Sequence, residues 1–229
     1  MPHTYSRSLL VLASGFSLGL VLTSPATAAS AIPAPIAAAI TDAARAPTDF
    51  PRDKNRKPAD MLAFANVKPG QHVVDFMPGR GYYTRLLSKT VGAKGKVYAY
   101  VPMSDNAEMQ KPVGERGSVD EMLAIGNAAG YENITVLWEV AENFGLPEQV
   151  DLVWTSNNYH DMHNKAFRAD AAKVDAGIFR ALKAGGSLVV IDHAAAPGTG
   201  FTQTEALHRA DKEAVRAEIL AAGFVFDGE

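Results

Sequence analysis

Short runs of apolar residues alternate with amphipathic segments along most of the chain. Each apolar run has the length of a buried strand, and residues 72–76 (His-Val-Val-Asp-Phe) form the first of them. The segment that follows, 82–90, carries Leu86 and Leu87 at positions suited to one helical face. The pattern predicts strands at 72–76, 96–101, 134–138, 151–155 and 187–191. It predicts helices from Pro58 to just before Lys68, at 82–90, 119–129 and 174–182, and from Asp211 to Gly223.

Strands that alternate with helices across short loops predict a parallel sheet with helices on both faces. Asp211 is a suitable N-cap for the last helix, and Gly223 suits the left-handed position that ends it. Residues 224–226 begin a further strand, and the chain stops at Glu229. Because sheets of this type normally finish with one more strand, we expect a doubly wound α/β fold of the Rossmann-like type that lacks its last strand.

The amino terminus has the pattern of an export signal. Arg7 precedes the uncharged apolar residues 8–22, and Ala26-Thr27-Ala28 has the small-residue spacing of a cleavage site. The apolar run is shorter than the roughly 20 residues that a membrane-spanning helix needs. Residues rich in Ala and Pro follow. We therefore predict a signal peptide over 1–28, a linker over 29–51 and one domain over 52–229, in a periplasmic or secreted protein without a stable membrane anchor.

The composition narrows the classes of chemistry. The chain has 22 Lys and Arg, 25 Asp and Glu, no Cys and a formal net charge of −3. Without Cys there are no disulfides, thiolate metal sites or thiol nucleophiles. The basic residues are scattered, which argues against nucleic acid as a partner and favours a small-molecule substrate; the oligomeric state stays open. Their densest cluster, interpreted as a solvated charged turn, is Arg52, Lys54, Arg56 and Lys57.

The turn after the first predicted strand is the strongest candidate for a binding site. Ligands of open parallel sheets bind beyond the carboxyl ends of the strands, where the strand order reverses. Residues 77–82 (Met-Pro-Gly-Arg-Gly-Tyr) follow that strand. Glycines let the backbone approach a ligand closely, and a helix that begins near Tyr82 directs free N–H groups at an anion. A glycine turn with a purely structural role is the competing interpretation.

Residues 75–81 resemble the first motif of the class I S-adenosylmethionine-dependent methyltransferases, an acid followed by three alternating glycines. Asp75 is the acid, Gly79 and Gly81 match, and Met77 takes the place of the first glycine. Residues 151–154, 157–163 and 179–188 are similar to later segments of that family, in the same order.

A narrower resemblance points to an exported group within that family. Residues 56–58, 79–84 and 192–193 are similar to a group of bacterial predicted methyltransferases that often carry export signals. The resemblance covers 52–229 and implies a Rossmann-like methyltransferase fold, with S-adenosylmethionine as cofactor and a small molecule as methyl acceptor. The chain departs from the family at Val101, where an acid normally holds the ribose.

The resemblance also implies roles for individual residues. His160 is the implied general base, with Asp161 as its orienting group or as an alternative base. Glu142 is implied to face the adenine, and the ring of Tyr82 or Tyr159 to attract the sulfonium cation. The implied cofactor-binding residues are Asp75, Met77, Gly79, Gly81, Tyr82, Glu142 and Asn157.

Two other interpretations use the same residues. S-adenosylmethionine is made in the cytoplasm, so an exported chain lacks an evident supply. A catalytically silent protein of this fold that binds a nucleoside-like or other small ligand is therefore the main alternative. The other is a metal site, for which imidazoles and carboxylates are suitable ligands. Its spacing matches no named motif, so no metal is predicted, and His208 is expected at the surface or in packing. The residues of that second alternative are His160, Asp161, His163, Asp192 and His193.

Overall fold

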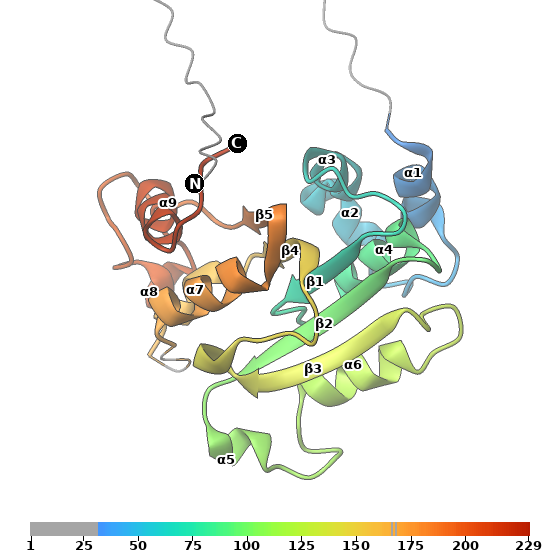
Figure 1. Cartoon of the computed structure of the whole chain (residues 1–229), viewed down its shortest axis with the longest axis horizontal. Coiled ribbons are helices and arrows are strands. Elements are labelled where there is room, and N and C mark those ends of the chain that lie inside the picture. Colours follow the sequence, from blue (N-terminus) through green and yellow to red (C-terminus); the bar gives the residue numbers. More distant parts are fainter. Residues whose placement is uncertain (1–31, 166, 168) are drawn as a thin grey trace, which may run out of the picture. The chain divides into compact units, whose positions relative to one another are not determined.

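The computed structural model describes residues 32–165, 167 and 169–229 and places a five-stranded parallel sheet within them (Figure 1). The predicted signal peptide, 1–28, lies outside the described residues. The strand order is β3-β2-β1-β4-β5, so β1 pairs with β2 on one side and with β4 on the other. The order therefore reverses beside β1. The strands are β1 (His72–Phe76), β2 (Lys96–Met103), β3 (Ile134–Val140), β4 (Val150–Ser156) and β5 (Leu182–Ile191).

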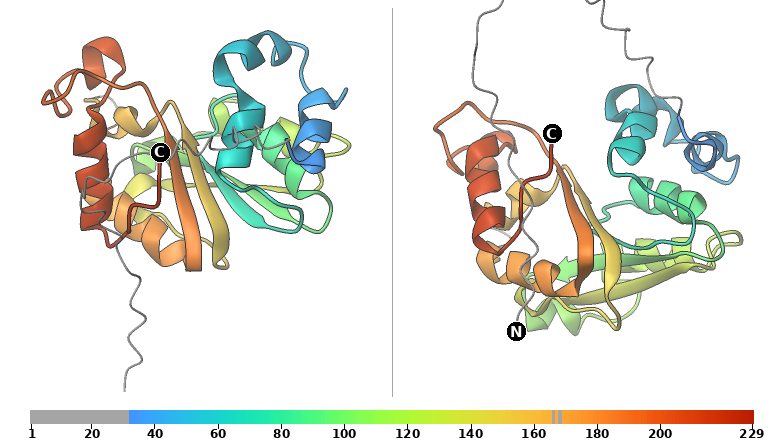
Figure 2. Two further views of the ribbon diagram at one scale, coloured as in Figure 1. Left: turned by 90° about the horizontal axis from the view of Figure 1, so that it is seen from above. Right: turned by 45° about the horizontal axis from the view of Figure 1, so that its top comes forward.

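Helices cover both faces of this sheet, as predicted (Figure 2). Successive strand residues point to opposite faces: Val73 is buried in the core beneath α1, α4 and α6, and Val74 in the core beneath α7. Burial on both faces explains why the strands read as continuous apolar runs. The helices are α1 (Ala34–Thr41), α2 (Phe50–Arg56), α3 (Pro58–Phe64), α4 (Tyr82–Val91), α5 (Asn106–Met109), α6 (Ser118–Gly126), α7 (Ala171–Ala181), α8 (Thr204–Leu207) and α9 (Lys212–Ala221), with two short 3-10 helices, η1 (Ala141–Asn143) and η2 (Tyr159–His163).

The five predicted strands and the five predicted helices are present, with differences at their ends. The helix expected over 174–182 begins at Ala171, because the Asp170 side chain accepts a hydrogen bond from the Lys173 N–H and caps it. Asp211 caps α9 in the same way, through the N–H of Glu213, as its sequence position predicts. No helix in the described part of the chain has the length and apolar character needed to cross a membrane.

Residues 224–226 do not begin a strand, which corrects the expectation for the end of the chain. The segment follows α9 instead of pairing with β5. The Glu229 carboxylate lies 2.7 Å from Arg216 Nη2 and 2.9 Å from Lys212 Nζ, and the Arg216 guanidinium covers the Phe226 ring at 4.1 Å. These contacts with α9 are made by side chains. An alternation of apolar and polar residues does not predict them.

Residues 32–51, the described part of the expected linker, pack into the domain. Helix α1 contacts α3 and α4, and Ile36 and Ala39 are buried in the core on that face. The Arg45 side chain is fully buried and pairs with Asp53 at 2.7 Å. The Ala-rich segment that was expected to be a linker therefore contributes a helix to the core.

Candidate functional site

The turn between β1 and α4 lies where the strand order reverses. Every second residue of this turn is left-handed: Met77, Gly79 and Gly81 have φ angles of 60°, 55° and 74°. The Met77 N–H donates to the Tyr100 carbonyl, and the Gly81 N–H donates to that of Pro78. The three alternating glycines of the motif therefore correspond to three left-handed positions. Met77 adopts that conformation at a cost of about 1–2 kcal/mol relative to glycine.

The two glycines of the turn differ in their surroundings. At Gly81 a Cβ atom would lie 2.5 Å from Ile125 Cδ1 and 3.0 Å from Met122 Cε, so the turn lies close against α6. At Gly79 a Cβ atom would meet no atom within 4 Å. The open backbone at Gly79 is therefore the part of the turn that a ligand can approach.

Asp75 fixes the start of the turn. Its side chain is buried near the carboxyl end of β1, and its Oδ2 accepts a hydrogen bond from the Thr84 hydroxyl at 2.6 Å. Burial raises the pKa of Asp75 to about 7, against the opposing effects of the Thr84 hydrogen bond and the charge of Arg56. The bond joins the carboxyl end of β1 to the first turn of α4 and so holds the intervening loop.

A cavity of about 70 Å³ lies over this turn. Helix α2 supplies two of its lining residues, Arg52 and Arg56, and the end of β4 supplies Ser156. Its volume is below the roughly 300–1,000 Å³ of most small-molecule pockets. The lining residues are Arg52, Arg56, Asp75, Met77, Pro78, Gly79, Arg80, Tyr82, Tyr83, Ser156 and Asn158.

Guanidinium groups surround the ring of Tyr82. Those of Arg52, Arg56 and Arg45 lie 4.8, 5.0 and 5.6 Å from its centroid. The Tyr82 hydroxyl donates to Asp53 at 2.6 Å. A sulfonium cation on this ring would therefore lie among these guanidinium groups as well as beside the Asp53 carboxylate.

The cavity residues that the sequence interpretation did not name as binding residues include Arg52, Arg56, Ser156 and Asn158. Arg52 and Arg56 belong to the cluster interpreted as a solvated turn, but they are half-buried on α2. Their spacing of four residues, which places both on one helix face, was the available signal. Asn158 joins the site because its Nδ2 donates to the Met77 carbonyl at 2.6 Å.

Three predicted cofactor residues, Gly81, Asn157 and Glu142, do not line this cavity. Gly81 lies against α6 instead. Asn157 is left-handed, with φ of 61°, and its N–H donates to the Ile191 carbonyl; its neighbours Ser156 and Asn158 face the cavity instead. Glu142 lies on η1, where its carboxylate accepts the Asp170 N–H at 3.0 Å. Asn157 and Glu142 are both at the carboxyl edge of the sheet, as the resemblance implies.

His160 lies at the same edge of the sheet but outside the cavity lining. Its side chain is buried, and Nδ1 lies 2.8 and 3.0 Å from the two carboxylate oxygens of Asp192. The His160 N–H also donates to Asp192, at 2.8 Å. Asp161 Oδ1 is 3.2 Å from the other ring nitrogen, Nε2. Asp192, which follows β5, is therefore the group that orients His160, a role expected of Asp161.

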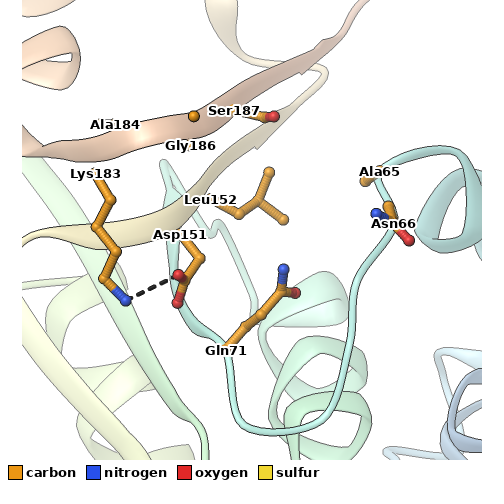
Figure 3. A pocket seen from close by; sticks show the side chains of 10 residues that line it. Ala65, Asn66, Gln71, Asp151, Leu152, Lys183, Ala184, Gly186 and Ser187 are labelled. Carbon is orange, nitrogen blue, oxygen red and sulfur yellow. Dashed lines mark hydrogen bonds and ion pairs between the residues drawn. The ribbon is translucent and has the colours of Figure 1, made fainter.

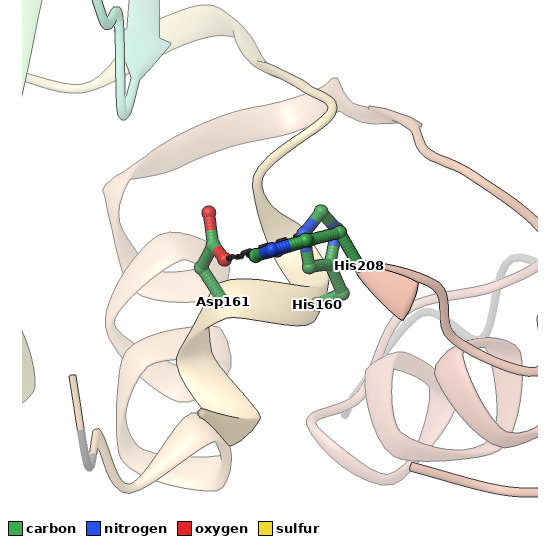
Figure 4. Close-up of side chains that lie close together, drawn as sticks. All are labelled: His160, Asp161 and His208. Carbon is green, nitrogen blue, oxygen red and sulfur yellow. Dashed lines mark ion pairs between the residues drawn. The ribbon is translucent and has the colours of Figure 1, made fainter. Parts of the chain in front are cut away.

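The histidines of the metal alternative do not converge. His163 Nε2 lies 3.0 Å from Glu218, and its ring stacks on Phe201 with centroids 3.5 Å apart. His193 is exposed. His208 is at the surface, as expected, and its ring lies beside that of His160, with the centroids 5.5 Å apart (Figure 4).

A larger cavity, of about 220 Å³, lies at the opposite, amino-terminal edge of β4 and β5 (Figure 3). Its charged residues are paired with each other: Lys183 Nζ lies 2.8 Å from Asp151 Oδ1. The other Asp151 oxygen accepts the His72 N–H at 2.8 Å. These bonds join β4 to β5 and to β1, so the pair has a structural role at this edge.

Comparison with known proteins establishes the fold of this chain. No family model and no curated protein sequence matches it. Among solved structures, a SAM-dependent methyltransferase from Aquifex aeolicus matches with a TM-score of 0.56 and 24% identity, over 77% of this chain and 84% of the other. The YcgJ protein from Bacillus subtilis matches with a TM-score of 0.52 and 16% identity, over 72% and 66%. The chain therefore has the Rossmann-like fold found in S-adenosylmethionine-dependent methyltransferases.

Proposed function

We propose that this protein is an S-adenosylmethionine-dependent methyltransferase that acts on a small molecule and is exported through residues 1–28. The observation that carries the proposal is the turn from Met77 to Gly81. Its three left-handed residues lie at the switch point of the sheet, and Gly79 leaves the backbone open to a ligand. Open parallel sheets bind their ligands at this point.

The residues around the turn fit the amino-acid end of the cofactor. Its carboxylate is an anion, and α4 begins directly after Gly81 with the N–H groups of its first turn. Arg52 and Arg56 add two guanidinium groups to the same cavity, which suit bidentate contacts with a carboxylate. Arg56, Gly79 and the start of α4 are therefore the proposed carboxylate site.

The rest of the cofactor requires the cavity to widen. A volume of about 70 Å³ holds only part of a molecule of this size, so we propose that on binding the Arg52 and Arg56 side chains turn from the Tyr82 ring toward the cofactor carboxylate and widen the cavity. At the end of β2 the buried Val101 offers no carboxylate to the ribose. We therefore expect weaker binding than in methyltransferases that have this acid.

When bound, the cofactor supplies a methyl group on a positively charged sulfur. Transfer is a direct displacement, so the main task of the protein is to align the acceptor with that methyl group. His160 is the proposed base for an acceptor that must lose a proton. Asp192 holds the proton on Nδ1 and leaves Nε2 as the acceptor nitrogen.

Equilibrium dialysis with S-adenosylmethionine tests the cofactor proposal. We expect the wild-type protein to bind, and Gly79→Val to weaken binding at least about tenfold, because a branched side chain at this left-handed position strains and covers the loop. Gly70→Val is the matched control. Gly70 is also exposed and left-handed, with φ of 84° and no atom near its missing Cβ, but it precedes β1 at the other edge of the sheet.

The outcomes separate the proposal from its alternatives. If the wild-type protein does not bind S-adenosylmethionine at millimolar concentration, the cofactor proposal is rejected. If Gly79→Val and Gly70→Val lose the same affinity, the turn has only a structural role. Binding without methyl transfer to any offered acceptor would support the catalytically silent alternative.

A further inference from the structure

We propose that His160, Asp161 and His208 form a binding site for a divalent transition metal ion such as zinc. Figure 4 shows His160 and Asp161 on the short helix η2, with His208 facing them from the end of α8. One ligand atom from each of the three residues lies within 4.8 Å of the others. No motif in the sequence brings His208 into this set.

The separations are close to those that a bound ion requires. Zinc–ligand bonds of about 2.0–2.2 Å place neighbouring ligand atoms about 3.0–3.5 Å apart. His160 Nε2 lies 3.2 Å from Asp161 Oδ1, and His208 Nδ1 lies 3.8 Å from the same oxygen. The His208 side chain is 66% exposed and so can move the remaining distance.

The hydrogen bonds of His160 leave a place for a cation. The carboxylate of Asp192 accepts from Nδ1, so this nitrogen carries the ring proton and Nε2 presents its lone pair. That lone pair faces Asp161 Oδ1, which is itself an acceptor. A metal ion between these two acceptor atoms, with a ring nitrogen of His208 as its third ligand, satisfies both of them.

Asp192 and Asn164 occupy the positions of supporting groups. Metal-binding histidines generally donate their other ring N–H to a carboxylate, which fixes the tautomer and the ring orientation. Asp192 does this for His160, and Asn164 Nδ2 donates to Asp161 Oδ1 at 2.8 Å. The exposed side of His208 leaves the remaining coordination positions open to water or to an oxygen ligand, as in catalytic zinc sites.

The metal site and the base role compete for the same atom. His160 Nε2 cannot both bind an ion and accept a proton from a methyl acceptor. The metal proposal does not depend on S-adenosylmethionine binding, because none of its three ligands lines the cavity over the Met77–Gly81 turn. Metal titration and cofactor dialysis therefore succeed or fail separately.

Calorimetric titration of the untagged protein with Zn²⁺ tests the site. We expect one tight binding event per chain, with Co²⁺ in its place giving the visible absorption of a low-symmetry nitrogen and oxygen site. His208→Ala should weaken Zn²⁺ binding at least about tenfold and leave the fold intact, because this side chain is exposed. His193→Ala, another exposed histidine at the same edge, is the control and should bind like the wild type.

A second variant tests the supporting carboxylate. Asp192→Asn keeps the shape of the side chain, and we expect a roughly 10- to 100-fold loss of Zn²⁺ affinity. Circular dichroism checks that this variant is folded, which matters because His160 is buried against it. The proposal is overturned if the wild type binds no Zn²⁺, or if His208→Ala binds as tightly as His193→Ala does.

Discussion

Asp175 is a fully buried carboxyl group on α7 whose charge is poorly compensated. Its Oδ2 lies 2.7 Å from the Tyr159 hydroxyl, and Glu218 approaches the same hydroxyl at 3.0 Å. A hydroxyl has one proton for two carboxyl groups, so a protonated Asp175 satisfies both contacts. Burial raises the pKa of Asp175 to about 7, and the charge of Glu218 adds to the effect, whereas the Tyr159 bond and His163 oppose it.

The pH dependence of stability should therefore carry a contribution from Asp175. A folded pKa above the ordinary value of 3.8 gives stability that is complete below that value and is lost as the pH rises through about 7. We expect the free energy of unfolding to fall by about 1–3 kcal/mol more in the wild type than in Asp175→Asn between pH 5 and pH 8. Urea unfolding at both pH values measures this, and parallel pH profiles for the two proteins would contradict it.

At the scale of elements, α4 is tied to the chain that precedes α2 by a buried ion pair. Arg85 Nη2 and Nε both lie 2.8 Å from Asp49 Oδ2, and the Asp49 side chain is only 1% exposed. Arg85 also donates to the Arg80 carbonyl at 3.1 Å. One guanidinium group thus holds the segment before α2, the start of α4 and the glycine turn together.

Removal of Arg85 should be strongly destabilising. In Arg85→Leu the buried Asp49 carboxylate keeps only the more distant Arg52, at 3.7 Å, and we expect a loss of about 3 kcal/mol in the free energy of unfolding. The double variant Asp49→Leu with Arg85→Leu should recover part of that loss, because no charge remains buried. Denaturant unfolding of the three proteins completes the cycle.

Lys173→Leu is the matched control for this cycle. Lys173 pairs with Asp170 at 3.2 Å, but its side chain is largely exposed. We expect a change below about 1 kcal/mol, as for most surface pairs. An Arg85→Leu variant that loses no more stability than Lys173→Leu would contradict a stabilising role for the buried Arg85–Asp49 pair.

At the scale of the whole molecule, both candidate sites lie at the carboxyl edge of one sheet. The glycine turn follows β1, η2 follows β4 and Asp192 follows β5. Asn158 joins the two, since it precedes η2 and donates to the Met77 carbonyl. The strand order, which places β4 between β1 and β5, is what brings these segments together.

Export is a property of the whole chain and remains a prediction. In a Gram-negative host we expect a periplasmic product whose first residue is Ala29, because cleavage follows the small residues Ala26 and Ala28. Ala28→Arg should block cleavage, so that the full-length chain accumulates. Thr27→Arg should still be cleaved, because the middle position of the Ala26-Thr27-Ala28 pattern accepts any side chain. Mass spectrometry of the fractions distinguishes the forms; a full-length cytoplasmic product from the wild type would contradict export.

Local chemistry in the sequence was sufficient to predict the five strands, the glycine turn and the helices α3, α4, α6, α7 and α9. The strands and helices follow from periodicity over a few residues, and Asp211 caps α9 through a bond to a residue two positions away. The turn from Asp75 to Gly81 was found because left-handed φ angles restrict residue type locally. These features depend on interactions between near neighbours, which the order of residues contains directly.

Only the tertiary structure decided which distant side chains meet. Arg52 and Arg56 lie on the Tyr82 ring, Asp192 rather than Asp161 holds His160 Nδ1, and His208 replaces His163 and His193 beside it. The packing of residues 32–51 into the core is also a set of contacts between segments distant in the sequence. Each of these contacts joins segments whose separation is set by strand order and helix packing. No local pattern of residues encodes such a contact, because its free energy comes from groups that meet only after the sheet has formed.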